Sequence, residues 1–365
     1  MAIAHLQITD FRNLATIDLT PCERGINILY GDNGSGKTSL LEAIYYLGLG
    51  RSFRTSLAHS IIRHSSQKFS LFARFINSNE RSIPIGVERE INGSLRLRLE
   101  EKELTSISEL ATLLPLRVIN SLSFQLLEAG PAARRKYLDW GLFYQNDNFL
   151  ACWRAYERIL KQRNALLRER RSKNELNTWT EELAKYGEEL NRMRANYVLA
   201  VIPFIEEMIQ ELLAIPQLSI TYQSGWDQSL SYTEALNQNY GEEMRFGRTL
   251  LGPHRADLEL RINGVEVKHF LSRGQQKLLI CAMILAQGKL LAKQVNKKLI
   301  YLIDDLPSEL DYQSKSRLIF LLSRQPTQIF ITAIERQMID GLIKNDFELP
   351  VKVFHVKHGS VRVES

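Results

Sequence analysis

A short run near the start of the chain combines glycines, a lysine and hydroxyl side chains at a fixed spacing. It reads Gly31-Asp32-Asn33-Gly34-Ser35-Gly36-Lys37-Thr38-Ser39, which matches the pattern G-x-x-x-x-G-K-[ST] at every position. Glycines let successive backbone N–H groups turn toward phosphate oxygens, and the N-terminus of a following helix adds a partial positive charge. Lys37 is predicted to reach the β- and γ-phosphates, and the Thr38 hydroxyl to take one coordination position of a Mg²⁺ ion. The run therefore predicts a nucleotide site.

The loop needs a strand before it and a helix after it, and the sequence supplies both. Residues 26–30 form an apolar run typical of a buried strand, and residues 39–47 carry apolar side chains at helical spacing. Residues 4–11 alternate like a strand and are followed by a polar turn that contains Arg12 and Asn13. We expect this turn to lie near the loop if its strands flank residues 26–30. Arg12 and Asn13 are therefore candidate nucleotide contacts.

A second apolar run, residues 299–303, ends in two acids, Asp304 and Asp305. A buried parallel strand would present both carboxylates at its carboxyl end, where ligands bind in α/β sheets. One carboxylate could hold Mg²⁺ through water, and the other could orient or deprotonate an attacking water. Adjacent strand residues point to opposite faces, so the two acids can take different roles. Seen alone, such a pair is more typical of a helix cap or a turn.

A third segment precedes a predicted helix over residues 278–291. It reads Leu271-Ser272-Arg273-Gly274-Gln275-Gln276-Lys277. Ser272 is a good N-cap, and Gly274 allows a close approach to the positive end of the helix, where a γ-phosphate could bind. The string by itself is a weak signal, because any capped helix begins in a similar way. Its weight comes from its occurrence in one chain with the loop and the paired acids.

From Phe149 onward, apolar residues recur at alternating spacings of four and three, as far as Phe204, with a charged link at residues 169–175. Two such helices joined by a short link should pack antiparallel as a stubby hairpin, whose first helix has about 24 residues and spans roughly 36 Å. The polar side and tip of the first helix are basic through Arg154, Arg158, Lys161, Arg163, Arg168, Arg170, Arg171 and Lys173. This basic face is either a DNA contact or an ordinary solvated helix surface.

A chain of 365 residues exceeds one typical domain, and we expect two lobes of α/β class. The predicted division is an N-terminal part of the nucleotide-binding lobe at 1–115, a mostly helical lobe with the hairpin at 116–245, and a return to the first lobe at 246–365. The formal charge of +6 and the pI near 9.1 favour a polyanionic partner. Three scattered cysteines, no long apolar stretch and no signal-like start predict a reduced, cytoplasmic protein without membrane contact.

Taken in order, the loop, L-S-x-G-Q, the apolar run with two acids, and Ser308-Glu309-Leu310-Asp311 resemble the ABC-type ATPase head. Transporters, SMC proteins and DNA-repair ATPases share this head. Within that group the chain resembles the RecF family of bacterial recombinational repair and replication proteins. The closer resemblance is carried by Phe11-Arg12-Asn13-Leu14, Gly31 to Ser39, Gly50-Arg51-Ser52-Phe53-Arg54, Gly130-Pro131, Arg134 to Asp139, Gly252 to Leu258, Leu271 to Gln275, and Leu302 to Asp305 with Ser308 to Asp311.

This resemblance implies an SMC-like ATPase head with an antiparallel β subdomain, a mostly helical second lobe, and the ligands ATP and Mg²⁺. It implies a homodimer that forms with ATP, in which Ser272, Arg273, Gly274 and Gln275 of one subunit meet the γ-phosphate held by the other. Asp304 takes the place of the Walker B magnesium acid, and Asp305 stands where most relatives have a catalytic glutamate. With Lys37, these acids are the predicted catalytic residues. Ser308, Glu309 and Asp311 correspond to the D-loop.

The family also implies a weak, DNA-stimulated ATPase that acts as a switch on single-stranded, gapped or junction DNA. It implies RecO, RecR and RecA as partners, in recombinase loading and the SOS response. The predicted DNA contacts are Arg51 and Arg54 in a basic loop, with Arg163, Arg170 and Arg171 on the hairpin. Two other functions stay open, an SMC-like structural DNA tether and the ATPase subunit of an ABC transporter. A structural tether would need a helical hairpin far longer than the residues between Phe149 and Phe204 permit.

The chain departs from the related pattern at two places. Thr332 stands where transporter heads carry a switch histidine, so sensing of a γ-phosphate by an imidazole is not expected. Residues 119–127 replace a stretch that is often Pro-Glu-Asp/Gly in the family. The residue that does the work of the Q-loop glutamine therefore stays unassigned.

Overall fold

The computed structural model describes residues 2–55, 57–77, 80–295, 297–305, 310–325, 327–336 and 349–364. The chain divides into two compact units. The first, which we call the head unit, comprises Met1–Ser123 and Lys277–Ser365, and the second, the arm unit, comprises Phe124–Gln276.

A six-stranded sheet carries the nucleotide-binding loop of the head unit. Its strand order is β15-β14-β3-β13-β12-β8, and all neighbours are parallel except β14 and β15. The central strands are short, buried and apolar, as expected for a parallel sheet covered on both faces. Because parallel strands end at the same edge, the loops after β3, β12 and β13 converge there. The strands are β3 (Ile26–Tyr30), β8 (Leu116–Ile119), β12 (Ile300–Ile303), β13 (Gln328–Ala333), β14 (Val351–Lys357) and β15 (Ser360–Glu364).

A second six-stranded sheet of the head unit is antiparallel, in the order β2-β1-β4-β5-β6-β7. Buried and exposed residues alternate along β1 and β4, so one face packs on the core. Asn92-Gly93, a dipeptide typical of hairpin turns, forms one here: Gly93 has φ 93°, and the Ser94 amide donates to Asn92 Oδ1 over 2.7 Å. The strands are β1 (Ala2–Phe11), β2 (Leu14–Leu19), β4 (Lys68–Ile76), β5 (Ser82–Glu90), β6 (Leu95–Leu99) and β7 (Lys102–Glu103).

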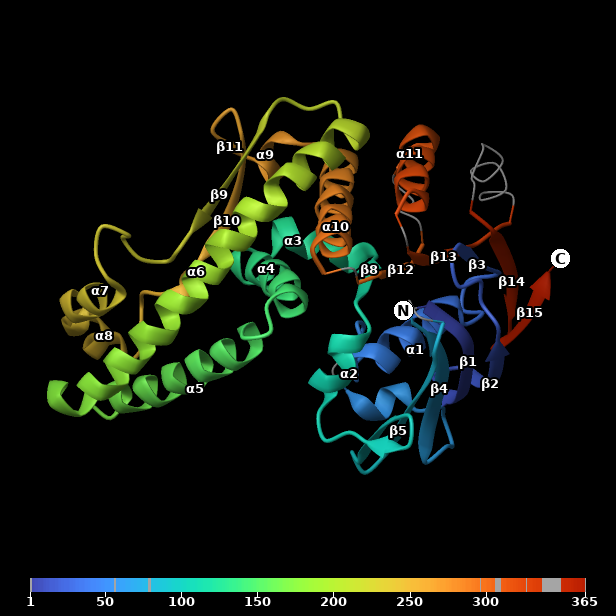
Figure 1. Ribbon diagram of the computed structural model, residues 1–365, viewed down its shortest axis with the longest axis horizontal. Helices are drawn as coiled ribbons and strands as arrows, with labels where there is room; N and C mark the ends of the chain where they lie inside the picture. The colour runs from blue at the N-terminus through green and yellow to red at the C-terminus, as the bar shows by residue number, and fades with distance from the viewer. Residues whose placement is uncertain are drawn as a thin grey trace. The chain divides into compact units, whose positions relative to one another are not determined.

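Helix α1 (Lys37–Leu49) lies between the two sheets of the head unit (Figure 1). One hydrophobic cluster joins its side chains, including Leu40, Ile44 and Leu47, with strand residues of both sheets. A helix packed on two sides must be apolar nearly all round, which explains why the sequence from Leu40 to Leu47 has little polar face. The other helical segments described in this unit are η1 (Ala58–Ile61), α2 (Ile107–Leu113) and α11 (Tyr312–Ser323), with η2 (Ser121–Phe124) at its boundary.

Helix α10 (Arg273–Val295) begins in the arm unit and continues into the head unit. It packs against β12, because a Cβ on Gly288 would lie 2.0 Å from the hydroxyl oxygen of Tyr301. Among the described helices it alone is long and apolar enough to cross a membrane, with a mean hydropathy of 1.5 in its most apolar window. Of that window, 72% is buried within the protein, the pattern of a core helix.

The arm unit is built on two antiparallel helices, α5 (Phe149–Arg168) and α6 (Lys173–Leu212), which Figure 1 shows side by side. Cys152 Sγ contacts the carbonyl of Tyr186, and Arg163 Nε donates to Thr180 Oγ1, so residue numbers rise along one helix and fall along the other. The predicted antiparallel hairpin is confirmed. Helix α5 is shorter than predicted, with 20 residues and a length of about 30 Å, because it ends at Arg168 before the charged link. Helix α6 is longer, with 40 residues, and begins with a capping box between Ser172 and Glu175.

Shorter elements complete the arm unit, including a three-stranded sheet of order β11-β10-β9. They are α3 (Gln125–Glu128), α4 (Pro131–Gln145), β9 (Leu218–Gln223), α7 (Tyr232–Gln238), α8 (Tyr240–Phe246), η3 (Pro253–Arg255), β10 (Asp257–Ile262), β11 (Val265–Glu266) and α9 (Val267–Phe270). A turn at Asn263-Gly264 joins β10 to β11, with φ of 50° and 79°.

The observed unit boundaries differ from those predicted at 115/116 and 245/246. Strand β8 pairs with β12, which places residues 116–119 in the head sheet. Strand β10 pairs with β9 along its length, so residues 257–262 belong to the sheet of the arm unit. Strand pairing between distant segments decides both boundaries, and local sequence pattern does not reveal it.

Candidate nucleotide-binding site

The predicted phosphate loop connects β3 to α1, as the sequence indicated. Gly31, Gly34 and Gly36 have φ of 149°, 78° and 118°. These left-handed values favour glycine. A Cβ on Gly31 would lie 2.1 Å from the carbonyl oxygen of Val356, and one on Gly36 would lie 2.8 Å from Leu14 Cδ2. Both backbone conformation and packing therefore require glycine at these two positions.

Lys37 is buried, and its ammonium group closes the loop on itself. Nζ donates to the carbonyl oxygens of Gly31 at 2.6 Å and Asp32 at 2.9 Å. Burial lowers the pKa of Lys37, while the carboxylates of Asp305, Asp304 and Asp32 act in the opposite direction. The cation is thus held in the loop by two carbonyl oxygens, close to three carboxylates, at a position from which it could also donate to a phosphate oxygen.

Ser35 offers an unused hydroxyl inside the loop. Its Oγ is buried and has no hydrogen-bond partner among the described residues. Asp32, Asn33 and Gly34 are exposed. A buried hydroxyl without a partner is costly unless a ligand satisfies it. The loop therefore fits a bound phosphate.

The turn between β1 and β2 braces the loop. Asn13 Nδ2 donates to the carbonyl of Gly34 at 3.1 Å, and Asn13 Oδ1 accepts from Ser39 Oγ at 2.8 Å. The expectation that this turn lies near the loop is confirmed. A contact of Asn13 with the nucleotide itself stays a prediction.

Arg12 is held by a carboxylate that the sequence analysis missed. Its Nε and Nη2 donate to the two oxygens of Glu42 at 3.0 and 2.7 Å, and its Nη1 donates to the carbonyl of Ser60 at 2.7 Å. Glu42 is fully buried on α1. These bonds fix the turn onto α1, and a contact of Arg12 with ATP stays a prediction. A lone acid in an apolar helix was the signal that could have revealed Glu42, because buried acids need a cationic partner.

The C-terminal hairpin also reaches the loop. The amide of Gly359, in the turn between β14 and β15, donates to the carbonyl of Ser35 at 2.9 Å. A Cβ on Gly359 would lie 2.3 Å from the carbonyl oxygen of Asn13. The sequence analysis assigned no role to this turn, although its glycine between two alternating runs was a visible hairpin signal.

Asp304 ends β12 beside the loop. Its Oδ1 accepts from Thr38 Oγ1 at 2.8 Å and from Thr332 Oγ1 at 3.0 Å. Burial raises the pKa of Asp304, and the two hydroxyl donors oppose this rise by stabilising the ionised carboxylate. Because Thr38 directs its hydrogen to Asp304, its lone pairs are left for a cation. The donor set of one hydroxyl and one carboxylate fits Mg²⁺, which keeps several waters and takes few protein ligands. In the described ranges, no group of three His, Cys, Asp or Glu side chains could form a separate metal centre.

Asp305 faces a different environment from its neighbour. It is exposed, has φ 53°, and its amide donates to Thr332 Oγ1 at 2.7 Å. A left-handed residue after a strand turns the backbone away from the strand direction. The sequence analysis expected distinct positions for the two acids, and the structure gives them distinct surroundings. It missed that Thr332 binds to both residues.

The segment with Ser272 begins α10 in the predicted manner. Ser272 Oγ accepts from the amide of Gln275 at 3.3 Å, and Gln275 Oε1 accepts from the amide of Ser272 at 3.0 Å, which together form a capping box. Ser272 and Arg273 are exposed, and Gly274 is half-buried. Ser308 and Glu309 of the predicted D-loop lie outside the described residues. Asp311 caps α11 by accepting from the amide of Ser314 at 2.7 Å.

The basic loop after α1 is tied to the same buried acid as Arg12. Arg54 Nη1 lies 3.6 Å from Glu42 Oε2, and Ser52 Oγ donates to Glu42. Arg51 and Arg54 are both exposed. The predicted DNA contacts of this loop are thus accessible, and their backbone is anchored to the helix that carries Thr38.

One predicted DNA contact on the hairpin is wrong. Arg163 is only 1% exposed, its Nη1 pairs with Glu243 at 2.7 Å, and it donates to Thr180 and Thr249. The four-three spacing placed position 163 in the apolar stripe, and a long cation can occupy a core position when a buried acid compensates it. Arg170 and Arg171 are exposed at the tip, where Arg171 pairs with Glu169 and Glu175.

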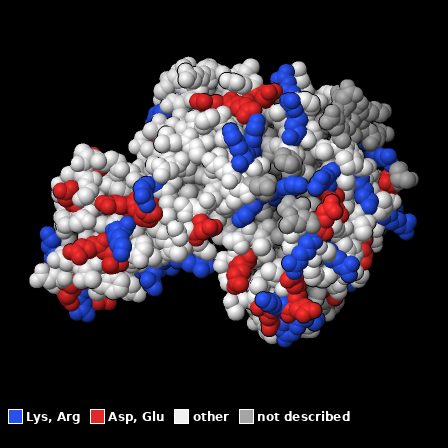
Figure 2. Space-filling view, viewed as in Figure 1, with Lys and Arg blue, Asp and Glu red and all other residues white. Residues whose placement is uncertain are grey.

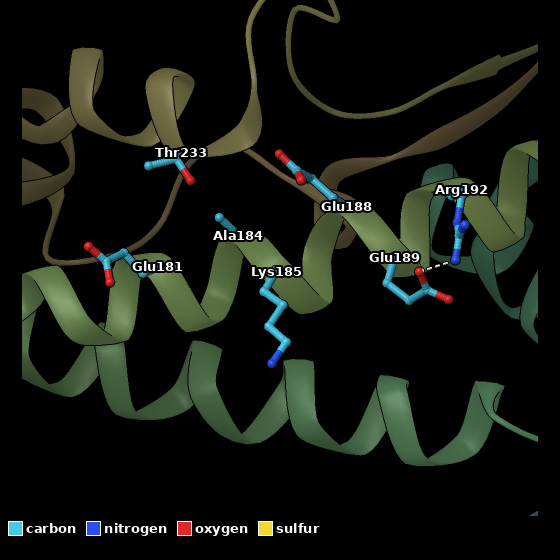
Figure 3. A pocket seen from close by; sticks show the side chains of 7 residues that line it. All are labelled: Glu181, Ala184, Lys185, Glu188, Glu189, Arg192 and Thr233. Carbon is cyan, nitrogen blue, oxygen red and sulfur yellow. Dashed lines mark hydrogen bonds and ion pairs between the residues drawn. The ribbon is translucent and has the colours of Figure 1, made fainter.

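The two helices of the hairpin present different charges. The exposed cations of α5 are Arg154, Arg158, Lys161 and Arg168. Between α6 and α7, a groove of about 500 Å³ is lined by the charged residues Glu181, Lys185, Glu188, Glu189 and Arg192, together with Ala184 and Thr233 (Figure 3). Figure 2 shows acidic and basic side chains interspersed on the face in view. An excess of carboxylates repels phosphates, so the α5 side is the better candidate for a DNA contact.

A family model and whole-chain relatives match this protein. The model of the RecF/RecN/SMC N terminal domain matches residues 2–361. A DNA replication and repair protein RecF from Shewanella denitrificans is 43% identical over 364 residues, covering 100% of this chain and 99% of the relative. One from Cellvibrio japonicus is 41% identical over 362 residues, covering 99% of each chain.

Solved structures agree with these relatives. Structures of the recombination mediator protein RecF in the RecFOR pathway, as RecF-ATP and as RecF-ATPrS, match with a TM-score of 0.86 and 26% identity. Each match covers 100% of this chain and 98% of the other. An Smc head bound to the C-terminal winged-helix domain of ScpA matches with a TM-score of 0.63 at 14% identity, which shows a common fold. With a complete phosphate loop that meets a strand-end acid, an ABC-type head and full-length similarity to RecF proteins, the chain belongs to the RecF family.

Proposed function

We propose that the protein is an ATP-dependent DNA-binding switch of recombinational repair and replication restart. The observation that carries the proposal is the hydrogen bond of 2.8 Å between Thr38 and Asp304, which joins the phosphate loop to the acid at the end of β12. In this arrangement Lys37 and the loop amides bind the phosphates of ATP, and Thr38 and Asp304 hold Mg²⁺, which neutralises phosphate charge when bound. The names of the relatives place RecF proteins in DNA replication and repair.

Hydrolysis is assigned to Asp305, whose carboxylate would orient or deprotonate the attacking water. Its exposure leaves room for such a water, and its proximity to Lys37 is consistent with a place beside the phosphates. A short aspartate at this position suits slow turnover, stimulated by DNA. In this proposal bound ATP sets the conformational and oligomeric state of the protein, and its slow hydrolysis ends that state.

ATP is proposed to hold two copies of the chain together. The exposed helix start at Ser272 offers the positive end of helix α10 to one γ-phosphate, and in heads of this type that phosphate belongs to a second subunit. Hydrolysis removes the shared ligand and weakens the dimer. Ser308, Glu309 and Asp311 are assigned to the same interface.

Sedimentation with ATP and with ADP tests this dimer in the wild type and in Ser272→Arg. The variant places a bulky cation at the cap, so we expect ATP binding to persist while dimerisation and turnover are lost. Ser231→Arg is the matched control, since Ser231 also makes a capping box, on α7. A wild type that stays monomeric with ATP and DNA, yet hydrolyses ATP, contradicts the proposal.

DNA binding is assigned to Arg51 and Arg54 in the head unit, and to Arg170, Arg171 and the exposed cations of α5 in the arm unit. Such contacts neutralise phosphates and carry no base specificity. We propose single-stranded, gapped or junction DNA as the target, and RecO, RecR and RecA as partners in recombinase loading and the SOS response. The cytoplasm is the corresponding location.

Gel shifts on gapped, duplex and single-stranded DNA, at several salt concentrations and with or without ATP, test the assignment of the DNA contacts. An affinity independent of salt contradicts it.

A further inference from the structure

Thr332 connects the two acids at the end of β12 through a single hydroxyl group. Its Oγ1 accepts from the amide of Asp305 at 2.7 Å and lies 3.0 Å from Asp304 Oδ1. An ionised carboxylate can only accept hydrogen bonds, so the one hydrogen of Thr332 must point to Asp304. The direction of both bonds is therefore determined, and one side chain fixes the carboxylate of Asp304 and the peptide of Asp305 at the same time.

The surroundings of Thr332 make this hydroxyl costly to lose. The residue is 1% exposed and is the last but one of the buried strand β13, which pairs with β3 before the phosphate loop. Without the hydroxyl, the amide of Asp305 would lose its acceptor, and Asp304 would keep Thr38 alone of these two hydroxyl donors. Asp305 also has φ 53°, a left-handed value that aspartate tolerates better than most residues. The bond from its amide to Thr332 Oγ1 ties that turn of the backbone to β13.

We propose that Thr332 is a positioning residue for the magnesium-dependent step, which orients Asp304 toward Thr38 and sets Asp305 beside it. This inference rests on the proposed ATPase function and deepens it. The hydrogen bond of Thr332 occupies the same carboxylate oxygen as that of Thr38, so both hydroxyls fix the rotation of the Asp304 side chain. A carboxylate held by two donors meets the cation without having to reorient, which raises affinity by preorganisation.

Three substitutions separate positioning from stability. Thr332→Val keeps the shape and removes the hydroxyl, and Thr332→Ser keeps the hydroxyl. Thr327→Val is the matched control, because Thr327 is another buried threonine, directly before β13, and its hydroxyl donates to the carbonyl of Leu299. It removes a buried hydrogen bond of the same kind at the opposite end of the strand.

The main measurement is the affinity for ATP at equilibrium, by calorimetry, first with EDTA and then with Mg²⁺. In Thr332→Val we expect an affinity in EDTA within about twofold of the wild type. The gain in affinity on adding Mg²⁺ should fall about tenfold, since a hydrogen bond to a charged group is lost. Thr332→Ser should restore that gain. Thr327→Val should lower the unfolding temperature but leave the gain in affinity on adding Mg²⁺ as in the wild type.

An unchanged gain in Thr332→Val overturns the proposal, and so does a parallel loss of both affinities that Thr327→Val reproduces. If Thr332→Val does not fold, Thr332→Cys, with a weaker donor of similar size, takes its place under the same criteria. A wild type that binds no ATP in either condition contradicts the proposed function itself, and is thus distinguishable from a failure of the Thr332 inference.

Discussion

The hydroxyl oxygen of Thr38 lies 2.8 Å from Oδ1 of Asp304, although 266 positions separate the two residues in the chain. Thr38 stands at the start of α1 and Asp304 at the end of β12, so the contact exists only because β3, β13 and β12 are parallel neighbours. A hydroxyl whose hydrogen is used by an acid is prepared to receive a cation on its lone pairs. This pair is the centre of the proposed site.

Lys37→Met should reduce the affinity for ATP at least about a hundredfold, because it removes the one full positive charge of the loop and with it the proposed contacts to the phosphates. Equilibrium binding of ATP measures the effect. Lys102→Met, at an exposed position on β7, is the control and should bind ATP like the wild type. Equal affinities in both variants would remove the basis for the nucleotide site.

Asp304→Ala and Asp305→Asn should fail at different steps. Asp304→Ala removes a carboxylate on the metal side, so Mg²⁺-dependent binding and turnover should fall together. Asp305→Asn keeps the size of the side chain and removes its basicity, so ATP should bind while hydrolysis falls at least about a hundredfold and dimers with ATP accumulate. Binding assays, single-turnover hydrolysis and sedimentation distinguish the two. A wild-type rate in Asp305→Asn means that another group activates the water.

Arg163 and Arg158 lie on the same helix, but substitution by alanine should affect folding stability at Arg163 and DNA binding at Arg158. Arg163→Ala leaves Glu243 buried without its cation, and should lower the free energy of unfolding by about 3–5 kcal/mol. Arg158 is exposed, so Arg158→Ala should leave stability nearly unchanged and reduce the salt dependence of DNA affinity. Urea unfolding and gel shifts at several salt concentrations test the pair. If Arg158→Ala binds DNA with unchanged affinity and salt dependence, α5 is not a DNA contact.

His254 should make the arm unit sensitive to acid. Its Nδ1 lies 2.7 Å from the hydroxyl of Tyr156, and burial lowers its pKa from 6.5 to about 4. The unfolded chain therefore takes up a proton at higher pH than the folded one. The stability contributed by His254 is complete above about pH 6.5 and is lost as the pH falls toward 4, by up to about 3 kcal/mol.

Unfolding of wild type, His254→Gln and His64→Gln between pH 7 and pH 4 measures this dependence. His64 is exposed in the head unit and serves as the control. We expect His254→Gln to flatten the pH dependence, and His64→Gln to leave it as in the wild type. Parallel curves for all three proteins would mean that His254 is not the titrating group.

Local pattern was enough to predict the elements that carry the chemistry. The strand, the phosphate loop and the helix around Gly31 to Gly36 could all be predicted from neighbouring residues. Only the order strand, glycine-rich loop, helix turns backbone amides toward a phosphate. The hairpin at Asn92-Gly93 likewise follows from local sequence, because Gly93 can take the left-handed φ of 93° that this turn needs. The four-three rhythm of α5 and α6 likewise predicted an antiparallel pair, since each helix must bury its own apolar stripe.

The sequence by itself determined the phosphate loop, the strand that ends in Asp304 and Asp305, the capped helix start at Ser272 and the helical hairpin. Tertiary structure alone decided which side chains meet. It joined Thr332 to both acids and Glu42 to Arg12, and it buried Arg163 against Glu243. The reason is physical: a motif is a property of neighbouring residues, whereas the partner of a buried polar group is set by the packing of elements that are distant in sequence.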